Sequence, residues 1–345
     1  MSATAEKRAE DVFRQALAAS SVSPLWDVMA NLVTETPQPS AVPFAWKYSD
    51  LKPQLMEAGR LITAEQAERR VLILENPGTQ GSHTVTDALY AGLQLVLPGE
   101  TAPVHRHTQS ALRFVLESEE AWTSVDGEPV NMAPFDLILT PSWRWHEHGG
   151  ASAPTIWLDG LDIPIVQRFA AGFAERDGNV PATNDAVSGR TRAAYGANLK
   201  PVTGSSEATD TPLFHFPHAV WSKSLADYSN KVPVDPHRGW SLEFTNPVNG
   251  GSIMRTISAF ATLIPPGMTT KPRRQSAGAV FAGVSGTGSL VVDGKSFDVG
   301  PKDVVAVPSW SALQIHNDGS DPLTLFSYSD QACHEKLGFW KESLS

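Results

Sequence analysis

Residues 103–114 read PVHRHTQSALRF and residues 141–149 read PSWRWHEHG, and these two stretches decide the fold and the chemistry of the chain. Alternate side chains of a β-strand lie on one face, so His105 and His107 can direct two imidazoles toward one ion. His146, in the second stretch, supplies a third imidazole. Three protein ligands leave coordination positions open for a substrate. The two stretches therefore predict a metal site on β-strands.

The composition favours a mostly β protein. Of the 345 residues, 41% are hydrophobic, which is enough to fill the cores of two domains. The 26 glycines and 26 prolines are spread along the chain, as is typical of short strands joined by turns. The net charge of −10 comes without a run of lysine or arginine, so we expect no nucleic-acid partner.

The number of cysteines limits which metal ligands the chain can offer, and the N-terminal sequence indicates its cellular location. A single cysteine, Cys333, excludes an intramolecular disulfide and a zinc site built from several thiolates. Any metal must therefore be bound by histidine and carboxylate groups. The first ten residues are charged where a secretory signal needs an apolar core, and no later apolar run approaches membrane-spanning length. We expect a cytoplasmic protein without a membrane segment.

The sequence contains an internal repeat. VDG at 125–127 and PSW at 141–143 recur at 292–294 and 308–310, both at an offset of 167 residues, and no gap is needed between them. Each copy consists of short apolar or alternating runs that end at turn signals, such as LQLVL before Pro98. This pattern predicts two copies of one antiparallel β-domain.

The motif spacing in the first copy resembles that of the cupins, which are double-sheet jelly rolls. Gly99 lies six residues before the His-x-His motif, and Pro141 lies five residues before His146. The chain thus resembles a bicupin, an all-β dominated fold of two jelly-roll β-barrels with peripheral helices.

The second copy has lost the candidate metal ligands. At the offset of 167, His105, His107, His146 and Arg113 correspond to Pro272, Arg274, Leu313 and Val280. Only the first barrel is therefore expected to bind metal, with one ion per chain. The histidines that match no ligand pattern and are expected to be structural are His215, His218, His237 and His316.

Helical spacing is found outside the barrels, over residues 4–19, 164–175 and 331–341. Residues 176–212 are rich in small and polar residues, which is typical of an irregular connection. The predicted organisation is an N-terminal helical and extended region that packs on the barrels (1–88), the metal-binding first cupin (89–175), a linker with inter-domain strands (176–250), the degenerate second cupin (251–330) and a C-terminal helix (331–345).

The first barrel also lacks the glutamate ligand that a usual cupin carries, because Ala111 and Leu112 occupy its positions. Three neutral imidazoles with open positions suit iron(II), zinc, copper or nickel, so the ligand type alone does not select the metal. Arg113 shares strand parity with Ala111 and is expected to point into the barrel. An unpaired buried arginine costs several kcal/mol or more, and its planar donors fit a carboxylate. A carboxylate substrate beside the metal would satisfy Arg113.

These residues carry a resemblance to the gentisate 1,2-dioxygenase family. The matching stretches are 105–114, 145–149, 69–77, 89–94 and 157–162, with a weaker match at 246–247 and 250–251. The resemblance implies an iron(II) enzyme of three-histidine type that converts gentisate and dioxygen to maleylpyruvate in aromatic catabolism. It also implies a homotetramer.

The same resemblance implies a role for each site residue. His105, His107 and His146 would bind iron, Arg113 and Arg69 would hold the substrate carboxylate, Gln94 would hydrogen-bond near the chelating oxygens, Tyr90 would line the ring pocket, and His148 would move a proton from the phenol.

Some alternatives stay open at this point. Residues 65–70 also have the pattern of a solvated helix, which would remove Arg69 from the site. Asp159 and Asp162 could be partners of the histidines or of the barrel backbone. The substrate could be salicylate or 1-hydroxy-2-naphthoate, although a polar Tyr90 favours the second hydroxyl of gentisate. A metal-binding cupin isomerase or a non-catalytic bicupin fits less well, because an isomerase more often retains the carboxylate ligand.

Overall fold

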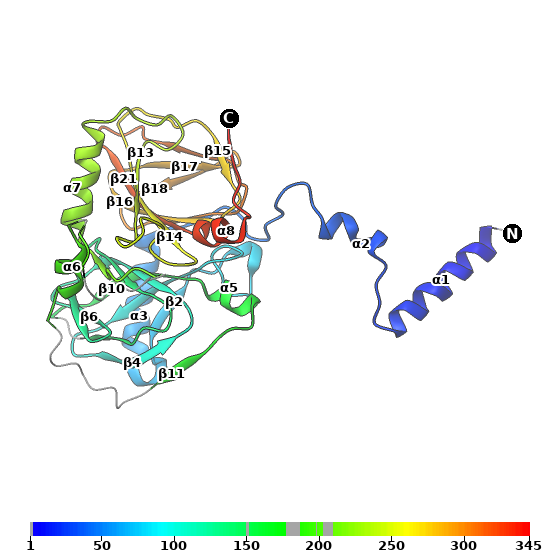
Figure 1. Ribbon diagram of the computed structural model, residues 1–345, viewed down its shortest axis with the longest axis horizontal. Helices are drawn as coiled ribbons and strands as arrows, with labels where there is room; N and C mark the ends of the chain where they lie inside the picture. The colour runs from blue at the N-terminus through cyan, green and yellow to red at the C-terminus, as the bar shows by residue number, and fades with distance from the viewer. Residues whose placement is uncertain (1–2, 150–151, 177–186, 198, 203–209) are drawn as a thin grey trace. The chain divides into compact units, whose positions relative to one another are not determined.

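The computed structural model describes residues 3–149, 152–176, 187–197, 199–202 and 210–345. The chain divides into two units, Met1–Gln38 and Pro39–Ser345. The first unit contains helices α1 (Ala3–Ala19) and α2 (Leu25–Leu32), and the second contains β-sheets with peripheral helices (Figure 1). Helix α1 confirms the helix predicted over residues 4–19.

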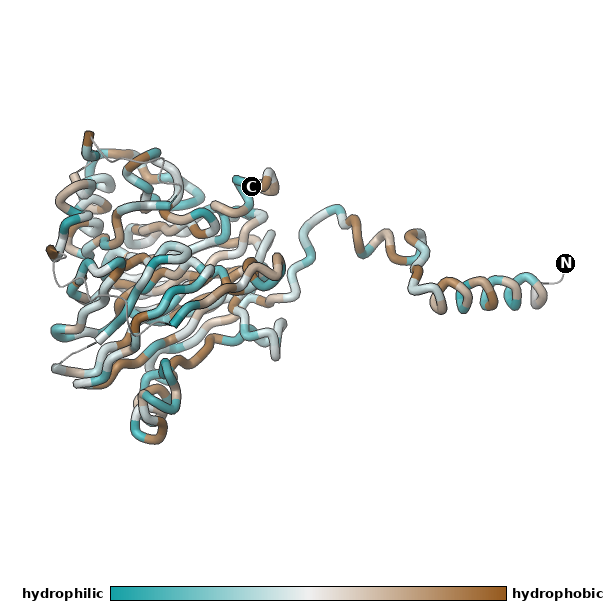
Figure 2. The backbone as a smooth tube through the Cα atoms, turned by 60° about the horizontal axis from the view of Figure 1, so that its bottom comes forward, coloured by the Kyte–Doolittle hydropathy of each residue, from teal (hydrophilic) through white to brown (hydrophobic). Residues whose placement is uncertain are grey.

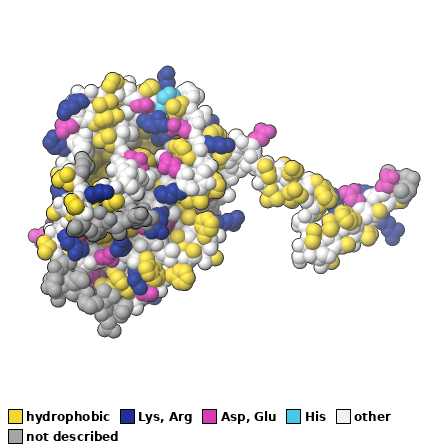
Figure 3. All heavy atoms as spheres, viewed as in Figure 1, with side chains coloured by type: hydrophobic (Ala, Val, Ile, Leu, Met, Phe, Trp, Pro, Cys, Tyr) yellow, Lys and Arg dark blue, Asp and Glu magenta, His cyan; other side chains and the backbone are white. Residues whose placement is uncertain are grey.

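The first unit is amphipathic. Polar and apolar residues alternate along its helices (Figure 2), and Arg14 of α1 forms ion pairs with Glu10 and with Asp27 of α2. Its apolar side chains lie on the surface, where Figure 3 shows them gathered on both helices. Neither these helices nor any other in the described part of the chain has the length and apolar composition needed to cross a membrane.

The first barrel consists of two antiparallel sheets, with the strand orders β12-β8-β5-β10-β3-β2 and β11-β4-β9-β6-β7. Its strands are β2 (Arg70–Ile73), β3 (Tyr90–Val96), β4 (Thr101–His107), β5 (Ala111–Glu117), β6 (Trp122–Val125), β7 (Glu128–Asn131), β8 (Leu137–Thr140), β9 (His146–Gly149), β10 (Thr155–Leu161), β11 (Ala174–Arg176) and β12 (His215–Phe216).

The second barrel repeats this architecture, with the strand orders β1-β19-β16-β21-β14-β13 and β18-β17-β20-β15-β22. Its strands are β1 (Phe44–Trp46), β13 (Trp240–Phe244), β14 (Ser258–Ile264), β15 (Arg273–Gln275), β16 (Ala279–Ser285), β17 (Gly288–Val292), β18 (Lys295–Val299), β19 (Val304–Val307), β20 (Leu313–His316), β21 (Leu323–Ser329) and β22 (Glu342–Leu344). Two double-sheet barrels in tandem confirm the predicted bicupin.

Helices and short turns lie around the barrels. They are α3 (Tyr48–Leu61), α4 (Ala64–Ala67), η1 (Pro77–Thr79), α5 (Ile163–Arg168), α6 (Arg190–Tyr195), α7 (His218–Ser229) and α8 (Gln331–Leu337). The segment that follows Gln38 contributes to both barrels, because β1 pairs with β19 of the second barrel and β2 pairs with β3 of the first.

The largest apolar core lies between the barrels. It joins Leu112 and Phe114 of the first barrel to Phe326 and Tyr328 of the second. The rings of Phe114 and Phe326 stack with centroids 4.1 Å apart, and the Tyr328 hydroxyl donates to the Tyr90 carbonyl oxygen at 2.8 Å. The two barrels therefore share one hydrophobic core.

Alternate side chains of strand β5 face the core between the barrels and the interior of the first barrel. Leu112, Phe114 and Leu116 belong to the core between the barrels. Arg113 and Val115 alternate with them and therefore face the interior of the first barrel, where Val115 belongs to a small apolar cluster. The apolar face thus continues without interruption while polar groups occupy the inner face.

The repeat register differs from the constant offset of 167. Arg113 lies opposite Asp159 and Phe281 lies opposite Ser327, so the offset is 168 in these strands. The first copy has one more residue between β5 and β6, and the second has one more between β20 and β21. The corrected equivalents of His105, His107, Arg113 and His146 are Arg273, Gln275, Phe281 and Leu313, instead of Pro272, Arg274, Val280 and Leu313.

Two predicted helices are shorter than expected. Helix α5 ends at Arg168 because Ala170 adopts a φ of 50°, and residues 174–176 then pair with β4 as strand β11. Helix α8 ends before Gly338, which has a φ of 74°, and the chain continues into β22. Part of the predicted linker, residues 177–186, 198 and 203–209, lies outside the described residues.

Gly160 on β10 permits the close approach of the two barrels. A Cβ atom at this position would lie 2.7 Å from Tyr328 Cζ and 3.0 Å from Leu112 Cδ1. We predict that Gly160→Ala lowers the free energy of unfolding by about 1–3 kcal/mol, because it overpacks this contact. Urea denaturation of the full chain measures the change. Gly172→Ala is the control, since its Cβ would meet only Gln109 Nε2 at 3.8 Å; equal stability of the two variants would contradict the prediction.

Candidate metal centre

Strands β4 and β9 bring three histidines together. His105 lies directly opposite His146 in the antiparallel pair, and His107 lies on the same face of β4 as His105. The ligand atoms of the three side chains lie within 4.8 Å of one another, and the rings of His105 and His146 have centroids 3.9 Å apart. Among the described residues this is the one group of three or more histidine, cysteine or acidic side chains with such spacing.

Backbone carbonyl groups fix the tautomer of each imidazole. The Nδ1 atoms of His105, His107 and His146 lie 2.8–2.9 Å from the carbonyl oxygens of Pro103, Gln109 and Arg144. A carbonyl oxygen can only accept, so each Nδ1 carries the proton and each Nε2 presents a lone pair. The Nε2 atom of His146 is buried without a hydrogen-bond partner. This donor set fits a transition-metal ion.

The three imidazoles are held in the neutral form that binds metals. Burial is the main cause, and it lowers the pKa of His105 to about 3 and that of His107 to about 4. Burial also lowers the pKa of His146 well below its usual value, with Arg113 as the next cause. Neutral ligands need not lose a proton before coordination at neutral pH.

Arg113 lies inside the first barrel, as the strand parity predicted. Its Nη1 donates to Thr140 Oγ1 at 2.5 Å, and its Nε lies 3.9 Å from Asp159 Oδ1. The Nε group is buried and has no hydrogen-bond partner. Burial lowers the pKa of Arg113 to about 10, so the guanidinium stays charged at neutral pH. Arg113 therefore has a donor free for an anion.

Asp159 and Asp162 have hydrogen-bond partners outside the three-histidine cluster. Asp159 accepts a hydrogen bond from Trp157 Nε1 at 2.8 Å and lies beside Arg113, while burial raises its pKa to about 6. Asp162 accepts hydrogen bonds from the Ser110 backbone N–H at 2.8 Å and from Thr256 Oγ1 at 2.5 Å. Neither carboxylate is a partner of the three-histidine cluster in these bonds.

Tyr90, Gln94 and Arg69 are the remaining predicted site residues. Tyr90 and Gln94 lie on the inner face of β3, and Gly92 between them makes room, since a Cβ there would lie 2.8 Å from the Tyr90 hydroxyl. A short helix, α4, does form over part of residues 65–70, but Arg69 lies beyond its end and lines a cavity together with His105. The charge of Arg69 contributes to the lowered pKa of His105.

His148 lies two residues after His146 on β9 and is buried beside the cluster. Its ring centroid is 5.7 Å from that of His146. Thr123 Oγ1 donates to the Glu147 carbonyl oxygen at 3.0 Å, and it lies 2.7 Å from His148 Nδ1. The hydroxyl proton is therefore used, so Nδ1 donates to Thr123 and Nε2 is left as a base.

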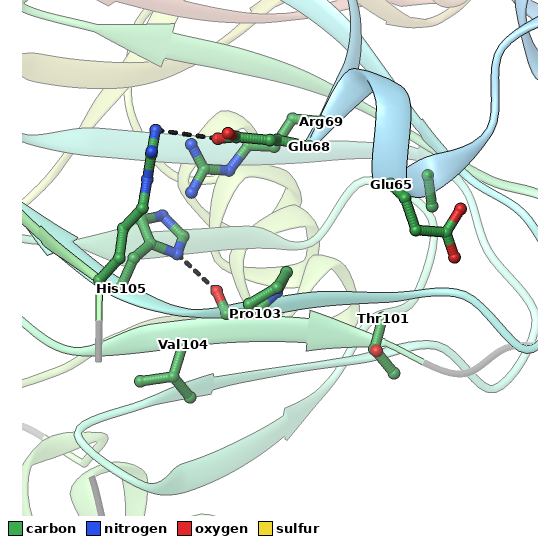
Figure 4. A pocket seen from close by; sticks show the side chains of 9 residues that line it. Glu65, Glu68, Arg69, Thr101, Pro103, Val104 and His105 are labelled. Carbon is green, nitrogen blue, oxygen red and sulfur yellow. Dashed lines mark hydrogen bonds and ion pairs between the residues drawn. The ribbon is translucent and has the colours of Figure 1, made fainter. Parts of the chain in front are cut away.

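A cavity of about 450 Å³ leads to His105. Figure 4 shows His105 and Arg69 in its wall, together with Glu68. Glu68 forms an ion pair with Arg176 at 2.8 Å across the cavity, and Arg176 lies opposite His105 in the β11–β4 pair. The other predicted site residues do not line this outer cavity. Glu68 and Arg176 were not predicted from the sequence, because residues 174–176 were not expected to form a strand.

Three of the four histidines expected to be structural contact neighbouring groups of the fold, while His316 Nε2 is buried without a hydrogen-bond partner. His215 Nε2 lies 2.8 Å from Asp136 Oδ2, the His218 ring packs against Trp221, and His237 Nδ1 lies 3.1 Å from the Pro272 carbonyl oxygen. These contacts agree with the structural role expected for them.

Both barrels match a known domain family. The cupin domain model matches residues 92–161 and 260–328, one stretch in each barrel. The chain is 42% identical to gentisate 1,2 dioxygenase 1 of Aquipseudomonas alcaligenes, over 96% of this chain and 95% of that protein. It is 34% identical to 5-aminosalicylate 1,2-dioxygenase of Comamonas sp, over 96% and 89%.

A solved structure shares the whole architecture. The salicylate 1,2-dioxygenase of Pseudoaminobacter salicylatoxidans, in a crystal structure of its adducts with gentisate, matches with a TM-score of 0.92 and 30% sequence identity. The match covers 100% of this chain and 95% of that chain. These relatives are all named as 1,2-dioxygenases of aromatic hydroxy acids or amino-substituted analogues.

We predict that His146→Ala abolishes metal binding, because it removes the buried Nε2 ligand atom that has no partner in the protein. Elemental analysis after anaerobic loading and desalting measures this loss, against about one ion per chain in the parent protein. His316→Ala, in the second barrel, is the control and should bind metal as the parent does. A His146→Ala protein with full metal content would contradict the assignment.

Proposed function

The chain belongs to the gentisate 1,2-dioxygenase family of ring-cleaving dioxygenases, and we propose that it uses iron(II) in the first barrel to convert gentisate (2,5-dihydroxybenzoate) and dioxygen to maleylpyruvate. The observation that carries the proposal is the juxtaposition of three neutral imidazoles with the buried, incompletely paired guanidinium of Arg113. Such a site fits an anionic substrate beside a cation. Both oxygen atoms of dioxygen enter the product.

His105, His107 and His146 would hold the iron through Nε2. Bound iron(II) supplies the redox chemistry that dioxygen requires and a Lewis-acidic centre for the substrate oxygens. The protein supplies no carboxylate ligand, since Ala111 occupies a position where a usual cupin carries glutamate. Anionic groups of the substrate therefore offer the negative charge that the ligand set lacks.

Arg113 and Arg69 orient the substrate in this proposal. The free Nε–H of Arg113 would donate a hydrogen bond to the substrate carboxylate, while Thr140 and Asp159 keep the guanidinium in place. A bound reactant fixed by two charged contacts loses little orientational freedom in the reaction. Gln94 would donate a hydrogen bond near the chelating oxygens, and Tyr90 would line the ring pocket.

His148 would act as the base for the phenolic proton. Its Nδ1–H donates to Thr123, so Nε2 is the atom that takes the proton. Burial lowers the pKa of His148 well below its usual value, which keeps the imidazole neutral before the substrate binds. The same group can return the proton to the product.

The main proposal and its alternative differ only in the substrate. The relatives include a 5-aminosalicylate and a salicylate 1,2-dioxygenase, so an aromatic 2-hydroxy acid other than gentisate is the second candidate. The polar Tyr90 beside Arg69 and Asp159 favours a ring with a second hydroxyl. We further propose a cytoplasmic homotetramer, as the family resemblance implies.

Substrate turnover tests the proposal directly. Purified protein is loaded anaerobically with iron(II), then given air and gentisate, salicylate or 1-hydroxy-2-naphthoate in separate reactions. We expect gentisate-dependent ultraviolet absorbance of maleylpyruvate with one dioxygen consumed per product. Faster turnover of another hydroxy acid would replace the substrate, and no turnover of any with iron bound would overturn the function.

We predict that Arg113→Ala keeps its iron but binds gentisate roughly 10- to 150-fold more weakly, as expected for a lost charge-assisted hydrogen bond. Anaerobic gentisate titration and KM measure the effect. Arg113→Lys keeps the charge without the planar donors and should recover only part of the affinity. The control is Arg274→Ala, on the outward face of β15 and paired with Asp293. Unchanged binding in Arg113→Ala would remove this residue from the substrate site.

We predict that His148→Gln lowers kcat by about 10²- to 10⁴-fold, the usual contribution of a general base, while iron content and KM stay near the parent values. Glutamine retains an amide that can donate to Thr123 but cannot take up the proton. Thr123→Val tests the positioning of the ring and should lower kcat by a smaller factor. A His148→Gln enzyme with parental kcat would show that another group moves the proton.

A further inference from the structure

The second barrel contains a cavity of its own, about 130 Å³ in volume. Strand β15 places Arg273 and Gln275 in its wall, and strands β16 and β21 contribute Phe281 and Ser327. The wall combines polar and apolar groups. An inward-facing arginine is not required to maintain the shape of a barrel. Its presence in the cavity wall indicates a site for a ligand.

This cavity occupies the position of the metal centre in the first barrel. Arg273 pairs with Leu313 as His105 pairs with His146. The Gln275 carbonyl oxygen accepts from the Trp310 N–H at 2.7 Å, and the His107 carbonyl oxygen accepts from the Trp143 N–H at 2.8 Å. In the second barrel, an arginine and a glutamine therefore stand where the first barrel has two histidines.

The two barrels also carry their inward-facing charged side chains on different strands. Phe281 lies opposite Ser327 where the first barrel has Arg113 opposite Asp159. The second barrel thus lacks the arginine and the aspartate of β5 and β10 but carries an arginine in place of a histidine of β4. A guanidinium supplies a fixed positive charge at the place where the first barrel would hold a metal ion.

Arg273 has an N–H group that no acceptor in the described part of the chain uses. Its Nη1 donates to Gln275 Oε1 at 2.6 Å, while its Nε is buried without a hydrogen-bond partner. No ion pair of Arg273 within 4.0 Å exists among the described residues. Burial, together with the nearby positive charge of Arg238, lowers the pKa of Arg273 to about 10, and the group is still charged at neutral pH.

The remaining charges near the cavity do not neutralise Arg273. Arg238 and Glu342 both line the cavity and form an ion pair with each other. Asp235 lies farther out, where its Oδ1 accepts hydrogen bonds from the backbone N–H groups of His237 and Arg238, each at 2.8 Å. Of the three charged side chains in the wall, one positive charge is therefore left over.

We propose that the second barrel is a binding site for a short aliphatic carboxylate, held by the guanidinium of Arg273. The planar donors of arginine match a carboxylate, the hydroxyl groups of Thr262 and Ser327 lie in the same wall, and Phe281 offers an apolar surface to a short alkyl group. The volume of about 130 Å³, compared with about 450 Å³ beside His105, restricts the ligand to small acids.

This inference is independent of the proposed dioxygenase activity, since it requires neither iron nor an aromatic substrate. The test uses the full chain with Arg113→Ala as the parent, which removes the carboxylate-binding arginine of the first barrel. The unfolding temperature is measured at constant pH and ionic strength while sodium acetate replaces sodium chloride. A ligand that binds only the folded state raises this temperature progressively, because the added stability grows with the logarithm of one plus the ratio of ligand concentration to Kd.

We expect acetate to raise the unfolding temperature of the parent and of a matched Arg274→Gln variant equally. Arg273→Gln should weaken the acetate effect at least about ten-fold, because the charge-assisted bonds are lost. Ala279→Leu, which fills the cavity and keeps the charge, should also abolish the effect and serves if Arg273→Gln does not fold. The wild-type protein, with gentisate saturating the first barrel anaerobically, provides the same comparison if Arg113→Ala does not fold.

Two outcomes would overturn the proposal: an unfolding temperature of the parent that does not rise when acetate replaces chloride, or an acetate effect that is unchanged in both Arg273→Gln and Ala279→Leu. Loss of gentisate turnover would leave the proposal standing, and loss of acetate binding would leave the dioxygenase proposal standing.

Discussion

The packing of two sheets against each other, across the core that contains Phe114 and Phe326, is the constraint on which the rest of the structure depends. Strands β5 and β10 are buried on both faces, so one face must be apolar to build the shared core. The other face is then free to carry polar groups into the barrel, because successive side chains point in opposite directions. Arg113 and Asp159 thus enter the interior without weakening the contact between the barrels.

Within the first barrel, local backbone bonds prepare the site for a cation. Each of the three imidazoles donates its Nδ1–H to a carbonyl oxygen two residues away, and this orients Nε2 toward a common point. Burial keeps the rings neutral, and the nearby arginines oppose their protonation further. The ligand set carries no negative charge of its own, so an anionic ligand is favoured at a cation held there. In the proposed function, a carboxylate-bearing substrate would supply this charge and pair with Arg113.

The two barrels show one architecture with different interiors. The first barrel replaces much of its apolar filling with histidines, Arg113, Asp159 and Gln94, and its interior apolar cluster is small. The second has a larger interior apolar cluster, and its polar cavity contains Arg273 at the position of His105. Arg273 thus places a fixed positive charge where the first barrel has a candidate metal ligand.

The sequence by itself determined the bicupin fold, the barrel that carries the histidines, and the inward direction of Arg113, because strand parity and motif spacing are local properties. It could not determine which residue of the second copy stands at each position. Two connections differ by one residue in opposite directions, so the motifs keep an offset of 167 while the strands before and after them have an offset of 168. It could not identify β11, the Glu68–Arg176 ion pair or the partners of Asp159 and Asp162. Those contacts join residues that are distant in the chain or lie on different strands, and only the pairing of strands in the folded sheets decides which of them meet.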